Sequence, residues 1–166
     1  MAAKYYAIKS CVQSTLKPIG AVDETGDIPI NFVNTFSQSR ESDSLAARAD
    51  GVEVITVESN VKYNFTLGME VITPEVMAMI MGAEYNKETN TITAKAEAPT
   101  TVYSLEGVFT LVGDDGSRLV KKMNIGKCRP VANNTVDLSS IDLSTFELQF
   151  TMLVDNGEFF KIINNA

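Results

Sequence analysis

The chain has 166 residues, of which 45% are hydrophobic and 21% are charged, which is the range of ordinary globular domains large enough to bury a core. Its net charge of −7 argues against sequence-specific DNA binding, which usually relies on a basic surface. The absence of histidine removes the usual general base, and only two cysteines remain as strong zinc ligands, so we expect no enzyme, no metal and no cofactor. No apolar run is long enough to predict a membrane-spanning helix, and we expect a single domain over residues 1–166.

Alternating hydrophobicity predicts strands in the first part of the chain, at Tyr5–Val12 and Ile28–Phe36. Residues 37–50 are polar, rich in serine and without a period, which predicts a long loop. We expect this loop to be mobile in the free subunit and to become ordered against a neighbouring subunit. The residues expected to make this contact are Arg40, Glu41, Asp43, Arg48 and Asp50.

Two further strands are predicted at Gly51–Glu58 and Asn60–Ile72, and in the second of them the odd-numbered residues from 61 to 71 are apolar. A short helix follows at Pro74–Met81. Thr73 is a suitable cap, proline suits the first turn, and Gly82 is suited to end the helix in a left-handed conformation. Because the helix is almost wholly apolar, we expect it to pack against the core. The residues expected to be buried are Val76, Met77 and Ile80.

Turn residues divide the second half of the chain into strands. An Asn-rich turn at 86–90 precedes a strand at Thr91–Ala94, and the Asp-Gly pair in the turn at 113–116 predicts a hairpin between Leu105–Val112 and Leu119–Ile125. Phe146–Val154 alternates cleanly, and the turn at 155–157 precedes a last apolar run from Phe159 to Ile163. The fold class is therefore mostly β, with one short helix.

Residues 118–129 contain five basic residues and no acidic residue. We expect this cluster to meet acidic residues of another copy of the chain, because the region from Glu53 to Glu97 has a surplus of acids. Two alternatives are a solvated strand face that meets acids of the same sheet, and a contact with an anion such as nucleic acid. The cluster consists of Arg118, Lys121, Lys122, Lys127 and Arg129.

Cys11 and Cys128 have no CxxC companion, and they predict two free, buried thiols in a reducing compartment. One long-range disulfide between them is the alternative.

The order of these elements over residues 28–163 resembles the major tail (tail tube) protein of long-tailed, non-contractile bacteriophages. The resemblance implies a β-sandwich or half-barrel of antiparallel strands flanked by one short helix. It also implies that six copies join their sheets into a ring, and that stacked rings form a tube whose lumen conducts DNA into the host. The implied partners are other copies of the chain, tape measure and tail terminator proteins, and DNA that passes without specific binding, with no membrane partner. The implied location is the virion tail, assembled in the host cytoplasm.

Other classes of protein fit the same pattern. One is a different β-rich assembly protein, such as a secretion-system tube, a pilus-like subunit or a capsid-decoration protein. Another is a ligand-binding β-barrel, which requires an apolar interior large enough for a cavity. An enzyme is the third, although no arrangement of carboxylates or nucleophiles favours it.

Overall fold

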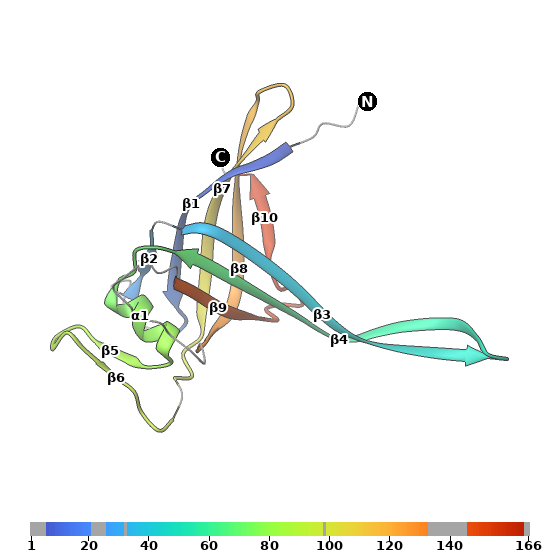
Figure 1. The fold of residues 1–166 in the computed structure, drawn as a ribbon, viewed down its shortest axis with the longest axis horizontal. Coiled ribbons are helices and arrows are strands. Elements are labelled where there is room, and N and C mark those ends of the chain that lie inside the picture. Colours follow the sequence, from blue (N-terminus) through green and yellow to red (C-terminus); the bar gives the residue numbers. More distant parts are fainter. Residues whose placement is uncertain (1–5, 21–25, 32, 98, 133–145, 165–166) are drawn as a thin grey trace.

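A computed structural model of the chain describes residues 6–20, 26–31, 33–97, 99–132 and 146–164. These residues form ten strands and one helix, which confirms the mostly β class. Eight strands make one antiparallel sheet in the order β2-β1-β7-β8-β9-β4-β3, with β10 paired to β8 beside that path (Figure 1). The strands are β1 (Tyr6–Pro18), β2 (Ile28–Ile30), β3 (Val33–Ala49), β4 (Val52–Met69), β7 (Tyr103–Gly113), β8 (Arg118–Val131), β9 (Phe146–Leu153) and β10 (Lys161–Asn164), and β5 (Glu84–Asn86) pairs with β6 (Thr91–Thr93) in a separate hairpin.

The core lies on one face of the curved sheet, where the predicted alternation of β4 and β9 is confirmed. Phe65, Leu67 and Met69 of β4 are buried, as are Leu148, Phe150 and Met152 of β9. The rings of Phe65 and Phe150 stack with their centroids 4.7 Å apart, because these residues lie opposite each other in neighbouring strands. Sheet curvature around this core gives the expected half-barrel.

Helix α1 (Pro74–Met81) begins and ends where the sequence predicts. The Thr73 hydroxyl accepts a hydrogen bond from the Val76 amide at 3.3 Å, and Gly82 takes the left-handed conformation with φ of 66°. Val76 and Ile80 are buried, but Met77 is only partly buried. Met77 lies about 100° around the helix from Val76, and so falls off the stripe that faces the sheet.

The prediction of a loop at residues 37–50 is wrong, because this segment is part of strand β3. It pairs with β4 from Val33 to Ala49, and Asp50 and Gly51 form the tight turn between the two strands with φ of 52° and 80°. The segment is polar because neither of its faces covers the core beyond Glu41. Figure 1 shows the outer halves of β3 and β4 projecting together as a two-stranded ribbon.

Several strand boundaries also differ from the prediction, and β1 and β8 extend beyond their predicted ends to Pro18 and Val131. Ile28–Phe36 is split between β2 and β3, and the two strands predicted between residues 51 and 72 form the single strand β4. The last strand begins at Lys161, because Phe159 and Phe160 pack on Tyr63 instead of joining the strand. Their ring centroids lie 4.9 and 5.7 Å from the centroid of the Tyr63 ring. The last strand pairs with β8 rather than β9. Strand β9 pairs with Lys127–Val131 of β8, and β10 pairs with residues 121–124 of the same strand.

Candidate assembly surfaces

The outer half of the β3–β4 hairpin, residues 43–59, is an exposed part of the fold, and we call it the arm. Its two strands are paired up to the turn, with Asp43 opposite Ser59 at its base, a register shift between Ala47 and Arg48, and Ala49 opposite Val52 near its tip. The arm is a ribbon of two strands only, and such a ribbon is marginally stable in water when nothing packs on it. The arm is therefore a feature that needs an external contact.

A β-bulge separates the arm from the core. Glu41 pairs with Lys62 and Asp43 pairs with Ser59, so Ser42 alone lies opposite both Asn60 and Val61. Asn60 has the positive φ of 52° that the bulge requires. The extra residue reverses the alternation of β4, since successive side chains of a strand point to opposite faces.

The reversal places an apolar cluster on the face of the ribbon opposite to the face that covers the core. Leu45 lies directly across from Val57, and Ala47 lies across from Ile55, so these four side chains share one face. Leu45 is 75% exposed, Ile55 57% and Val57 55%. These four residues form what we call the arm face, with Asp43 on the same side at its base. An exposed apolar cluster on an isolated ribbon is typical of an interaction site.

The five residues predicted to contact a neighbour are all placed in β3 or its turn. Arg40 forms an ion pair with Glu58 that spans the bulge. The Arg40 guanidinium, through its hydrogen bond and its charge, lowers the pKa of the Glu58 carboxyl from the usual value. Glu41 is exposed beside the bulge, and Asp43 accepts a 2.9 Å hydrogen bond from the Asn60 amide. Arg48 and Asp50 lie at the tip of the arm.

The basic cluster follows strand β8, and its members do not share one face. Lys122 pairs with Glu106 at 2.9 Å and Lys127 pairs with Asp155 at 2.9 Å, so both meet acids of their own chain. For these two lysines the structure therefore agrees with the alternative prediction, in which a solvated strand face meets acidic residues of the same chain. Lys121 lies on the opposite side of the strand from Lys122, where its ammonium donates to the amide oxygen of Asn164. Arg118 and Arg129 are exposed.

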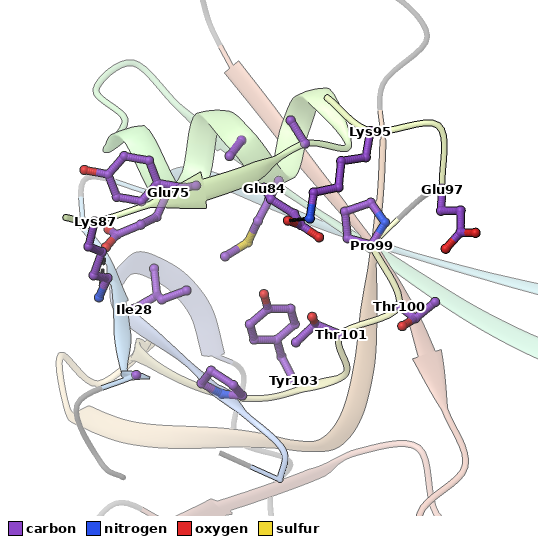
Figure 2. Close-up of a pocket in the computed structure, with 16 residues that line it drawn as sticks. Ile28, Glu75, Glu84, Lys87, Lys95, Glu97, Pro99, Thr100, Thr101 and Tyr103 are labelled. Carbon is purple, nitrogen blue, oxygen red and sulfur yellow. Dashed lines mark ion pairs between the residues drawn. The ribbon is translucent and has the colours of Figure 1, made fainter. Parts of the chain in front are cut away.

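A surface groove of about 590 Å³ lies between α1, the β5–β6 hairpin and the start of β7. Figure 2 shows Tyr103 and Thr101 on one side and two ion-paired lysines on the other. Lys87 pairs with Glu75 at 3.0 Å, and Lys95 pairs with Glu84. These charges at the rim differ from the apolar interior that a ligand-binding barrel requires.

Two titratable side chains lie opposite each other in strands β7 and β8 beside this groove, Tyr103 and Cys128. Burial raises the pKa of the Tyr103 phenol, and burial raises the pKa of the Cys128 thiol from 9.0 to about 12. Cys128 is a free thiol, whereas the side chain of Cys11 lies outside the described part of the chain. Among the described residues, no three metal-ligating side chains come together, and no helix is long and apolar enough to cross a membrane.

No family model matches the chain, and no curated protein is similar to it. Several solved structures are similar to it at low identity. A chain of the anti-feeding prophage baseplate has a TM-score of 0.48 at 10% identity over 95% of both chains. A chain of the anti-feeding prophage cap, which terminates the tube, has a TM-score of 0.45 at 14% identity over 99% of this chain and 95% of the other. A chain of the sheath-tube complex of an extracellular contractile injection system has a TM-score of 0.40 at 16% identity over 93% and 88%.

Proposed function

We propose that this chain is a structural subunit of a tail-type tube, in which copies associate through their arms and through sheet edges. The arm face carries the proposal. It exposes Leu45, Ile55 and Val57 on a side of the ribbon that faces away from the core of its own chain. Burying such side chains on another copy gains about 25 cal/mol for each Å² of apolar surface removed from water. Self-association is therefore the state that the arm favours.

The role is the one implied by the tail-tube resemblance. Sheet edges support it too: β3, β2 and β10 each have one neighbour in the described sheet, so each leaves a row of backbone groups for strand pairing. Copies that join through such edges can close into a ring when the rotation between them returns on itself. A ring of six copies, stacking of rings, a lumen that conducts DNA, and contacts with tape measure and tail terminator proteins belong to this proposal. So do a place in the virion tail, assembly in the host cytoplasm and a non-contractile tail.

Paired substitutions on the two faces of the arm test the proposal. Leu45 and Ala46 are neighbours in β3, both are exposed, and they lie on opposite faces of the ribbon. We expect the wild-type chain to form rings or tubes at high concentration in negative-stain micrographs. Leu45→Asp abolishes them because it places a charge in the apolar contact.

The matched control is Ala46→Asp, which adds the same charge on the other face and leaves assembly intact. Both variants keep the wild-type melting temperature, because the arm lies outside the core. A wild-type chain that stays monomeric at all concentrations, or equal assembly of both variants, contradicts the proposed function.

A further inference from the structure

Along β7 and β8 the core face of the sheet continues beyond the buried core, and among the described residues its side chains there are partly or fully exposed. The pair Gly107–Met123 is followed on the same face by Phe109–Lys121 and then by Leu111–Leu119. Met123 is 7% exposed and belongs to the core, but Leu119 is 37% exposed. Ile162 of β10 lies opposite Met123 and is 48% exposed. We call the set Phe109, Leu111, Leu119, Lys121 and Ile162 the end face.

We propose that the end face of one copy receives the arm face of a second copy, with the Asp43 carboxylate of the arm against the Lys121 ammonium of the end face. This inference rests on the proposed self-association and names the surface that the arm contacts. The occupant is a second copy because the arm of the same chain projects away from the end of β7, β8 and β10 (Figure 1). The apolar side of the ribbon also faces away from its own core.

The two faces have matching compositions. Each is an apolar patch built across paired strands, and each contains one charged side chain of opposite sign. Asp43 and Lys121 are held by neutral amides, of Asn60 and Asn164, so neither charge is neutralised within the described chain. By contrast, Lys122 on the other side of β8 is paired with Glu106. Opposite charges at the edge of an apolar contact determine orientation, whereas the apolar area supplies most of the affinity.

The geometry makes the contact head to tail, since the arm face and the end face are different surfaces of the same chain. A head-to-tail contact closes into a ring or continues as a filament, whereas pairing of two identical arms stops at a dimer. This difference allows a complementation experiment with two defective variants. Leu45→Asp destroys the arm face and keeps the end face, and Leu119→Asp destroys the end face and keeps the arm face.

We expect each variant alone to remain monomeric in sedimentation velocity, and an equimolar mixture to form a 1:1 complex through the single intact contact. If arms pair with arms, Leu119→Asp assembles like the wild type and the mixture forms no such complex. Either result overturns the end face as the receptor. Circular dichroism melting of each variant verifies that it is folded.

Charge reversal tests the predicted pair. Asp43→Lys and Lys121→Asp each weaken association by roughly tenfold, and the double variant Asp43→Lys/Lys121→Asp recovers wild-type association. Lys122→Glu is the control, and it leaves association unchanged because its side chain points to the other face. Loss without recovery, or no loss in Lys121→Asp, overturns this docking while the Leu45→Asp result still supports the proposed function. A wild-type chain that never self-associates overturns both.

Discussion

The Asn60 side-chain amide donates a 2.9 Å hydrogen bond to the Asp43 carboxylate, and this bond joins the two strands beside the bulge where the arm leaves the core. Asn60 is one of four non-glycine residues with positive φ in the described chain, and asparagine tolerates this conformation better than most residues. The bond and the backbone conformation therefore stabilise the same local feature. That feature reverses the alternation of β4 between the core and the arm.

Deleting Asn60 should remove the bulge without reversing the arm. Ser42 would then lie opposite Val61 alone, while the pairs Leu45–Val57 and Ala47–Ile55 keep both their register and their face. We expect a folded chain with a near-normal melting temperature that still assembles, measured by sedimentation velocity. Asn60→Gly should behave in the same way, since glycine adopts positive φ readily and keeps the bulge. Loss of assembly in the deletion variant alone would show that the contact needs the bulge itself and not only the side of the arm that carries the apolar residues.

Helix α1 should depend on Ile80 more than on Met77. Ile80 is 1% exposed, so Ile80→Ala leaves a cavity and lowers the free energy of unfolding by about 2–5 kcal/mol. Met77 is only partly buried, so Met77→Ala and Met77→Asp cost less than the several kcal/mol expected for a residue wholly within the core. Urea unfolding gives the free energy of unfolding of each of the three variants, and so the order of their losses. A larger loss for either Met77 variant would contradict the observed facing of the helix.

Cys128 should be unreactive while the chain is folded. Burial raises the pKa of its thiol from 9.0 to about 12, so at neutral pH almost no thiolate is present to react. In a Cys11→Ser background, we expect alkylation by iodoacetamide to be slow in buffer and fast in denaturant.

The raised pKa of the Cys128 thiol also makes the stability of the fold depend on pH. The stabilising contribution is complete below pH 9.0 and is lost as the pH rises toward 12, because the unfolded thiol ionises first. Cys128→Ala removes this part of the pH dependence.

The ion pair beside the bulge should be visible in the titration of Glu58. Arg40 lowers the pKa of this carboxyl, so the pair contributes stability above the usual glutamate pKa and loses it as the pH falls through the lowered value. Both side chains are exposed, and we expect the effect on overall stability to be small. A carbon-detected NMR titration should show that the pKa of Glu58 lies below the usual glutamate value. In Arg40→Gln this difference should disappear.

Regular alternation made part of the fold predictable. The core residues of β4 and β9 follow from apolar side chains at every second position, and α1 follows from Thr73, Pro74 and Gly82. The first strand of the arm was not predicted because neither of its faces covers the core, so residues 43–49 show no apolar alternation, whereas its second strand was predicted at Gly51–Glu58. The available signal was Asp50-Gly51, a pair typical of tight hairpin turns, placed between Ala49 and Val52.

Which side chains share a face of the sheet depends on the register between strands, and the sequence alone did not reveal that register. Val57 and Val61 are both odd-numbered and suggest one common face, but the bulge between them places them on different faces. In the same way, the basic cluster could be recognised from composition, whereas the separation of Lys121 from Lys122 depends on how β8 pairs with β7 and β10. Pairing of β10 with β8 rather than β9 is likewise a property of the folded sheet.

The bulge also limits how this chain can diverge. Because the apolar side is determined by counting residues outward from Asn60, adding one residue to each strand between the bulge and the Leu45–Val57 pair would invert the arm. Adding two residues to each strand would lengthen the arm and keep the apolar residues on the same side of it. Beyond Ala47 and Ile55, toward the tip, insertions of any size leave the apolar pairs where they are. Relatives that retain the contact are therefore expected to vary in length at the tip freely, and next to the bulge only in even steps.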